Sequence, residues 1–387
     1  STDSDGSRAD MGAFPYLNSY SGSDWYVDID GNDIIGTGEL SNPFASIQAG
    51  INFSSDHDSV FVGPGTYLEN VNYRGHSVSV KGIEGANNTI VDGNVSGPVF
   101  SANSGEDTTT SLEGFTIQNG TGTYVYINDG NLGTIGGGIF VNNANLSVSS
   151  CIVTNNHVTY SGGGIGAYQN QSIEIHDCEV LNNTAGQDGG GVLLHGGLSE
   201  IINTDIVENS ARNGGGLTIS GTVSELNRLN IHGNTASSQG GGLFSSSNYV
   251  LSNSLIFNNL AEYGGGIKNH YHLNPTIINS NIVKNEASES GGGISYSGLI
   301  DGPQTIINSI VYYNTSPLGA QFHSDDSDMT LLNSIVQDWD LTDSNIDLDP
   351  RFINLAENDF HLSDLSPALG AGLDTLMVPL LDYEGNV

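Results

Sequence analysis

The stretch Ser161-Gly162-Gly163-Gly164-Ile165 decides the fold, because it recurs along the chain. Each copy is a glycine triplet followed by one aliphatic residue, and an asparagine stands a few residues ahead of all but the first. The triplets begin at Gly136, Gly162, Gly189, Gly214, Gly240, Gly264 and Gly291. A repeat of about 26 residues is typical of a solenoid, in which each repeat forms one coil.

Aliphatic residues and alanines keep fixed places relative to a marker asparagine in each repeat. The markers are Asn156, Asn183, Asn209, Asn234, Asn259 and Asn285. Short parallel strands stacked in register would place like residues above like, with asparagine amides hydrogen-bonded along their own column. The pattern predicts an all-β parallel β-helix of roughly twelve coils. The same structural role is expected of Asn253, Asn279, Asn308 and Asn333.

Composition limits the partners. The 387 residues include 43 acidic and 8 basic ones, which gives a formal charge of −35. Nucleic acid and anionic membrane surfaces are therefore poor partners, since phosphate neutralisation needs Lys and Arg. No apolar run is long enough to span a bilayer, so no membrane insertion is expected. The sequence favours a mature exported protein that is secreted, extracellular or attached to the cell surface.

Cys151 and Cys178 stand one repeat apart. They should lie one above the other at about the strand spacing of 4.8 Å. Either two inward free thiols or a disulfide would fit this place, and the stacked thiols are favoured because small residues occupy it in later repeats.

Three regions are expected along the chain. Residues 1–24 form an N-terminal arm and 25–348 form the β-helix. A short amphipathic capping helix near 42–52 follows from Asn42, Pro43 and the apolar positions Ile47 and Ile51. Residues 349–387 form C-terminal coils and a tail. An excursion over 120–135, with Tyr124 and Tyr126, should project as a loop.

Several local patterns carry a resemblance to a known family. They are Asn42-Pro43-Phe44 followed by Gly63-Pro64-Gly65-Thr66-Tyr67, the Asn…Ala…Gly-Gly-Gly-Ile coil, and Asp349-Pro350-Arg351-Phe352…Phe360-His361-Leu362…Ser366-Pro367-Ala368. The chain resembles the secreted right-handed parallel β-helix repeat proteins of bacteria. The resemblance covers residues 25–387 and implies the fold, while members serve as adhesins, surface stalks or polysaccharide-degrading enzymes.

The resemblance also implies a displaced ending, since the family's usual last strand is similar to residues near the N-terminus here. We therefore expect the arm to complete the C-terminal coils of a neighbouring copy, giving a head-to-tail filament. The arm residues are Asp5, Gly6, Arg8, Asp10, Met11, Gly12, Ala13, Phe14 and Tyr16. The acceptor residues are Phe352, Phe360, Leu362, Pro367, Leu369 and Tyr383. The arm could equally fold back on its own chain, or the chain could be one unit of a tandem array.

No residues form a complete catalytic set. The basic residues of the shaft, Arg212, Arg228, Lys268 and Lys284, occupy different points of the repeat, which disfavours a lyase. Asp205 echoes one motif of polygalacturonases, but its partners are missing. The sequence thus favours a non-catalytic structural protein without a cofactor. The alternative is a polysaccharide-binding or polysaccharide-degrading β-helix or an adhesin, which should show a groove beside one sheet with carboxylates or aromatic side chains.

Calcium is the ion that the sequence favours if one is bound. Asp28, Asp30 and Asp33 offer hard oxygens around a Gly-Asn turn, as calcium loops do. A solvated acidic surface explains the same residues.

Overall fold

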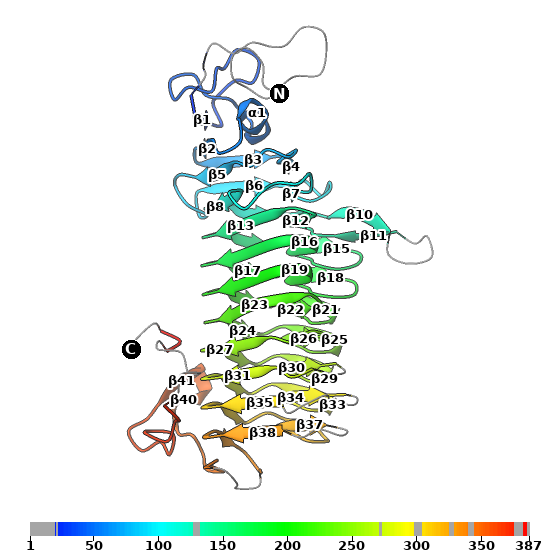
Figure 1. The fold of residues 1–387 in the computed structure, drawn as a ribbon, viewed down its shortest axis with the longest axis vertical. Coiled ribbons are helices and arrows are strands. Elements are labelled where there is room, and N and C mark those ends of the chain that lie inside the picture. Colours follow the sequence, from blue (N-terminus) through cyan, green and yellow to red (C-terminus); the bar gives the residue numbers. More distant parts are fainter. Residues whose placement is uncertain are drawn as a thin grey trace. The chain divides into compact units, whose positions relative to one another are not determined.

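Short parallel strands stacked in register build the protein, as a computed structural model shows (Figure 1). The structure describes residues 20, 22–126, 132–270, 273–297, 304–324, 329–339, 344–374 and 382–384. The fold is an all-β parallel β-helix with very little helix, which confirms the predicted class. It has about 10 turns, fewer than the expected twelve, because residues beyond 349 leave the solenoid. The chain divides into two compact units, Ser1–Gly186 with Gly191–Ser199 and Gln187–Gly190 with Glu200–Val387.

Parallel ladders make up the first unit. One ladder joins β1 (Asp24–Val27), β2 (Ser59–Val62), β5 (Ser79–Gly82), β8 (Ser111–Glu113), β13 (Asn145–Ser149) and the second half of β16 (Ile165–His176). A second joins β4 (Val71–Asn72), β7 (Phe100–Ala102), β12 (Ile139–Asn142) and the first half of β16. A third joins β3 (Gly65–Leu68), β6 (Thr89–Asp92), β9 (Thr116–Gln118), β14 (Ile152–Thr154) and β17 (Glu179–Leu181), and a short fourth pairs β15 (His157–Val158) with β18 (Thr184–Ala185). β19 (Val192–Ile202) begins in this unit.

The second unit repeats the arrangement. Its ladders are β22 (Leu217–Ile219), β26 (Leu243–Ser245), β30 (Ile267–Asn269), β34 (Ile294–Tyr296) and β37 (Phe322–Ser324); and β23 (Thr222–Asn227), β27 (Val250–Ser252), β31 (Thr276–Ile278), β35 (Gln304–Ile307) and β38 (Met329–Leu332). The others are β20 (Asp205–Val207), β24 (Asn230–His232), β28 (Leu255–Phe257), β32 (Asn281–Val283), β36 (Ile310–Tyr312) and β39 (Ile335–Val336); and β21 (Ser210–Asn213), β25 (Thr235–Gln239), β29 (Leu260–Tyr263) and β33 (Glu286–Ser290).

The marker asparagines form the predicted ladder inside the shaft. In the first unit Asn156 Nδ2 donates to Asn183 Oδ1 at 3.0 Å. In the second unit each amide donates to the next, in the order Asn209, Asn234, Asn259, Asn285 and Asn314, at 2.9–3.1 Å. The last amide, of Asn314, donates to Gln321 Oε1 at 2.8 Å. A buried amide stacked in this way satisfies its donors and acceptors without water, which stabilises the column.

The glycine triplet is required by close backbone approach. A Cβ on Gly241 would lie 2.4 Å from the carbonyl oxygen of Gly265 in the next coil. The first glycine of the same triplet, Gly240, has φ +65°, a backbone conformation that suits glycine. The triplet therefore allows the coils to stack at strand spacing where the chain turns into the next strand.

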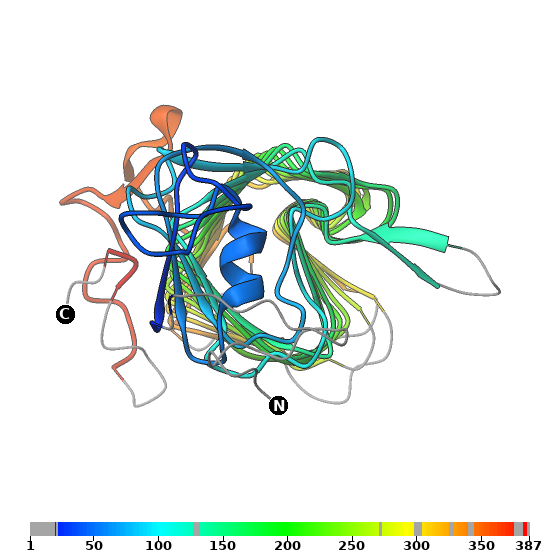
Figure 2. The same ribbon diagram turned by 90° about the horizontal axis from the view of Figure 1, so that it is seen from above.

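The predicted capping helix exists, but it starts later than expected. α1 (Ile47–Phe53) has Ser46 as its N-cap, and the Glu69 carboxylate accepts hydrogen bonds from the first helical N–H groups, at 2.8 Å from Ile47. Asn42 is not the cap, since it lies four residues before Ser46, and its side-chain amide instead donates to the carbonyl of Ile35 at 3.1 Å. The helix contacts β1, β2 and β4 and lies across the opening of the first coils (Figure 2).

Residues 120–135 hold a β-hairpin rather than a loop. β10 (Thr123–Tyr126) pairs antiparallel with β11 (Leu132–Ile135), and the ribbon projects from the coils of the first unit (Figure 1). Its inner face is anchored, since Val125 packs against the buried cluster of Ile135, Phe140 and Leu193. Tyr124 and Tyr126 are exposed.

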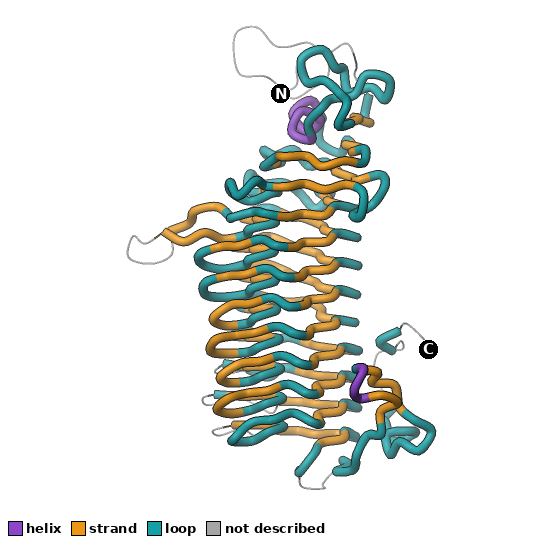
Figure 3. The backbone as a smooth tube through the Cα atoms, turned by 180° about the vertical axis from the view of Figure 1, so that it is seen from behind, coloured by secondary structure: helices purple, strands orange, loops and turns teal. Residues whose placement is uncertain are grey.

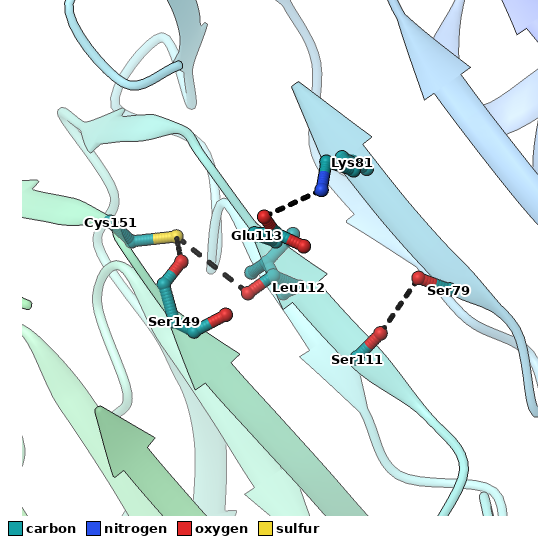
Figure 4. Close-up of polar contacts among 7 residues, drawn as sticks. All are labelled: Ser79, Lys81, Ser111, Leu112, Glu113, Ser149 and Cys151. Atoms are coloured by element: carbon teal, nitrogen blue, oxygen red, sulfur yellow. Dashed lines mark hydrogen bonds and ion pairs between the residues drawn. The ribbon is translucent and has the colours of Figure 1, made fainter. Parts of the chain in front are cut away.

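The two cysteines are free and buried, as expected. Cys151 Sγ donates to the carbonyl of Ser149 at 3.2 Å and lies 3.8 Å from that of Leu112 (Figure 4). Burial raises the pKa of Cys151 to about 12 and raises that of Cys178 as well. Figure 4 also shows Lys81 of β5 paired with Glu113 of β8 on the outer face of their ladder, and Lys81 Nζ lies 2.7 Å from Glu113 Oε1.

The C-terminal segment does not form the predicted coils. β40 (Phe352–Asn354) and β41 (Asp359–Leu362) pair antiparallel around the 3-10 helix η1 (Leu355–Glu357). In Figure 3 this segment lies beside the coils of the second unit. Its antiparallel pairing and its packing on the flank, described below, replace the expected stacking at the open end. Among the described residues, none of the helices is long and apolar enough to cross a membrane.

Candidate functional site

Strand alternation gives the second unit an outer flank with side chains of mixed polarity. On β28 and β32, Ile256 and Ile282 point into the shaft and are fully buried. Their neighbours, which include Leu255, Phe257 and Asn281, therefore point outward because successive side chains of a strand face opposite sides. This flank is the surface on which the C-terminal segment packs.

Aromatic contacts attach the C-terminal segment to the flank. Phe360 packs with Phe257 and Val283 in one buried cluster, with Phe352 against it. The rings of Phe257 and Phe360 meet edge to face at a centroid distance of 5.0 Å, and His232 stacks on Phe257 at 4.6 Å. Edge-to-face pairs of this kind add to the stabilisation from burial.

Polar contacts hold the segment at two further places. Lys284 Nζ donates to Asn358 Oδ1 at 2.6 Å and to the carbonyl of Leu355 at 3.1 Å. Asn308 makes a two-way contact with Leu373, donating to its carbonyl at 2.9 Å and accepting from its N–H at 2.7 Å. Asn333 donates to the carbonyl of Ala371 at 2.9 Å. The segment is thus held against its own chain.

A groove lies between the flank and this segment. It consists of two adjoining depressions of about 550 and about 240 Å³. The two depressions share five lining residues, which are Asn279, Asn281, Leu362, Asp382 and Tyr383. The larger depression adds Leu255, Glu357, Asn358, Asp359, Phe360, His361 and Glu384. None of the described residues that line either depression is Lys or Arg.

His361 joins two parts of the groove wall. Its Nδ1 lies 2.5 Å from Asp359 Oδ1 on the same strand, and its Nε2 lies 2.9 Å from Glu384 Oε1. Hydrogen bonds to Asp359 and then to Glu384 raise the pKa of His361. The hydrogen bonds from His361 lower the pKa of Asp359. Because the imidazole is largely exposed, at 61%, solvent screens both ion pairs.

Tyr383 presents a half-buried ring and hydroxyl in the wall. Burial raises its pKa, and the carboxylates of Asp205 and Glu384 raise it further. Tyr383 lines both depressions, and its raised pKa keeps the hydroxyl protonated at neutral pH. Asp205, noted in the sequence as a motif echo, thus lies near the groove rather than in a set of catalytic acids.

Asparagines with a left-handed backbone run along the other wall. Asn253 and Asn279 have φ +49°. Asn279 Nδ2 donates to Asn253 Oδ1 at 3.3 Å, and Asn253 Nδ2 donates to Asn227 Oδ1 at 3.1 Å. Asparagine tolerates this conformation better than most residues, which explains its recurrence here in addition to the amide contacts.

The predicted acceptor residues are partly found in this site. Phe360, Leu362 and Tyr383 line the groove, and Phe352 packs beside it. Leu369 is exposed and Pro367 is half-buried. The predicted donor arm, residues 1–16, lies outside the described residues, so donation of a strand to a neighbouring copy stays a prediction.

The predicted calcium ligands are engaged in turns of the first unit. Asp28 Oδ1 accepts from the N–H of Asp30 at 3.0 Å, and Asp33 Oδ1 accepts from the N–H of Ala45 at 2.7 Å. Within the described part of the chain, no group of three or more His, Cys, Asp or Glu side chains is placed to hold a metal ion. Calcium binding by Asp28, Asp30 and Asp33 stays a prediction.

Sequence reasoning missed most of the groove. Asp359, His361 and Glu384 carry no repeat signal, and Glu384 is 23 residues from His361. Asn281 and Leu255 could have been assigned to an outer face from strand alternation. Which face the C-terminal segment covers was not predictable from local pattern.

No known protein family and no curated protein matches the sequence. The parallel β-helix is similar to the crystal structure of pectate lyase Pel9A, with a TM-score of 0.51 and 13% identity over 94% of this chain and 96% of that one. XylC in complex with xylose gives a TM-score of 0.47 and 11% identity over 81% and 75% of the two chains. The GH136 lacto-N-biosidase from Eubacterium ramulus gives 0.30 and 12% over 80% and 68%. At these identities the likeness to Pel9A shows the fold alone.

Proposed function

We propose that the protein is a polysaccharide-binding β-helix whose groove takes a neutral glycan chain. The observation that carries this proposal is the groove itself, which lies beside one sheet and combines amides, carboxylates and a tyrosine with no Lys or Arg among its described lining residues. This is the feature that separates the polysaccharide alternative from a purely structural subunit.

The lining suits sugar hydroxyl groups. Hydroxyls both donate and accept, and the amides of Asn279 and Asn281 do the same. The carboxylates of Asp359 and Glu384 add acceptors, and the half-buried Tyr383 offers an apolar ring with a polar end. The volume of the larger depression, about 550 Å³, is in the range of small-molecule sites and would hold part of a polymer.

Charge favours a neutral polymer over an acidic one. The protein carries −35, and the described groove lining contributes Glu357, Asp359, Asp382 and Glu384 without a Lys or Arg to offset them. A uronic acid polymer would bring further negative charge to this surface, which is unfavourable unless cations intervene.

Binding is favoured over cleavage by the state of the carboxyl groups. Hydrolysis of a glycosidic bond by a carboxyl pair needs one member protonated as the acid. Hydrogen bonds from His361 lower the pKa of Asp359, so this carboxyl group is ionised near neutral pH and unsuited to act as the acid. The proposal is therefore a binding protein, placed outside the cell, without hydrolytic activity.

The test is affinity electrophoresis against soluble xylan, mannan and β-glucan, with polygalacturonate as the acidic comparison. Retardation by at least one neutral polymer is expected, and Tyr383→Ala and Asn281→Ala should each weaken it about tenfold. Tyr126→Ala is the matched control, since Tyr126 is exposed on the hairpin of the first unit. The absence of retardation, or equal loss in the control, would refute the proposal. Release of reducing ends from any of these polymers would show hydrolysis and refute the proposal of a binding protein without hydrolytic activity.

A further inference from the structure

The interior of the second unit is polar at one corner of three successive coils. The last inward position of the strand is apolar on β22, where it is Ile219. On β26, β30 and β34 the equivalent position holds a polar residue, namely Ser245, Asn269 and Tyr296. All of these side chains are buried. Polar groups inside a shaft need partners, because an unpaired buried donor or acceptor costs about 1–3 kcal/mol.

Two more buried polar side chains stand at the start of the next strand in two of these coils. Tyr249 precedes β27, and Gln304 begins β35. They occupy equivalent places in their coils, because β27, β31 and β35 pair in register. Tyr249 Oη donates to Asn269 Oδ1 at 3.1 Å, which orients the amide so that its Nδ2 faces away from Tyr249.

Three atoms of this cluster have no hydrogen-bond partner among the described residues. They are Asn269 Nδ2, Tyr296 Oη and Gln304 Oε1. Their side chains are 0%, 2% and 2% exposed, so bulk water does not reach them. Tyr296 and Asn269 are adjacent in register. Burial and the nearby Tyr249 raise the pKa of Tyr296, and the Asn269 amide lowers it, so the amide lies close to the hydroxyl although the two do not meet in hydrogen-bond geometry.

We infer that this corner binds one internal water molecule, which bridges Asn269, Tyr296 and Gln304 inside the shaft. The ligand must accept from the amide N–H and donate to the Gln304 carbonyl, while the Tyr296 hydroxyl serves in either role. A metal cation is excluded as the ligand because the Asn269 Nδ2 is a donor. Water meets all three requirements, and buried waters in proteins typically make about three such bonds.

The test uses the sign of a stability change. Without a ligand, Tyr296→Phe removes an unpaired buried hydroxyl and should leave the melting temperature unchanged or raise it. With the bridging water, the same change removes a hydrogen bond and should lower the melting temperature by about 3 °C. Tyr249→Phe is the control, since it breaks the bond to Asn269 in either case.

A crystal structure of the unaltered protein gives an independent readout that does not depend on the variant folding. An ordered water within hydrogen-bonding distance of Asn269 Nδ2, Tyr296 Oη and Gln304 Oε1 is expected. A dry corner, or a melting temperature that is unchanged or raised in Tyr296→Phe, would overturn the inference.

Discussion

Replacing Asn259 by alanine tests how much one rung of the asparagine ladder contributes to stability. Asn259 is in the middle of the column and is 1% exposed. Its Oδ1 accepts from the backbone N–H of Asn234 at 3.0 Å and from Asn234 Nδ2 at 3.0 Å. Its Nδ2 donates to the carbonyl of Ile231 at 2.9 Å and to Asn285 Oδ1 at 2.9 Å. The substitution therefore removes four buried hydrogen bonds at once.

The expected loss follows from these contacts. A net contribution of about 1 kcal/mol for each bond gives about 4 kcal/mol. The value should not be smaller, because the backbone N–H of Asn234 is left without its acceptor in a place that water does not reach, and Asn234 Nδ2 keeps only its bond to the carbonyl of Ile206. A loss of this size is a large part of the stability of an ordinary domain.

Urea unfolding followed by circular dichroism measures the loss. Asn248→Ala is the matched control in the same unit, since Asn248 is exposed and accepts one hydrogen bond, from the N–H of Asn274 at 2.6 Å. It should lose no more than about 1 kcal/mol. If Asn259→Ala were no more destabilising than this control, the ladder would not hold the coils together as argued.

Three other predictions concern single positions. The thiols of Cys151 and Cys178 should resist a thiol reagent in the folded protein, since they are buried and their pKa values are raised, and should react fully in denaturant; rapid reaction in buffer would contradict this. Gly241→Ala should destabilise by at least about 2 kcal/mol in urea, because its Cβ would meet the backbone of the next coil, and a neutral effect would refute the close-approach argument. Hydrogen bonds to Asp359 and Glu384 raise the pKa of His361, so its ion pair with Glu384 stabilises the tail at a pH below about 6.5, and this contribution is lost as the pH rises through the folded pKa. An NMR titration should show that Glu384→Gln lowers the pKa of His361. An unchanged pKa would disprove the contact between His361 and Glu384.

The repeated interior was predictable from the sequence because each coil solves the same packing problem. Asn259 and its equivalents recur since their amides donate to one coil and accept from the other along the column. The glycine triplets recur since any Cβ, as at Gly241, would strike the next coil. The repeat period carries this information, so the fold and the stacked thiols followed from it, whereas the existence of α1 followed from the local pattern of Asn42, Pro43, Ile47 and Ile51.

The exterior was less predictable because it depends on contacts between distant parts of the chain. The start of α1 depends on Glu69, which belongs to another coil. Its carboxylate accepts hydrogen bonds from the N–H groups of Ile47 and Gln48, the first two residues of the helix. The course of the C-terminal segment is set by Phe257 and Phe360, whose ring contact joins positions far apart in sequence. The local sequence around Phe360 does not predict that it packs on the outer flank of the second unit rather than at the open end of the solenoid.

The groove can also be understood from the two uses of asparagine in this chain. In the inward column, which includes Asn259, the side-chain amides form hydrogen bonds with neighbouring coils. Two members of the column with left-handed backbone, Asn308 and Asn333, hold the backbone of Ala371 and Leu373 through their amides. Asn279 belongs to that same column and lines the groove beyond the segment. An amide that pairs with backbone groups inside the molecule has the right chemistry to pair with the hydroxyls of a glycan, which is why the proposed binding face lies beside the C-terminal segment.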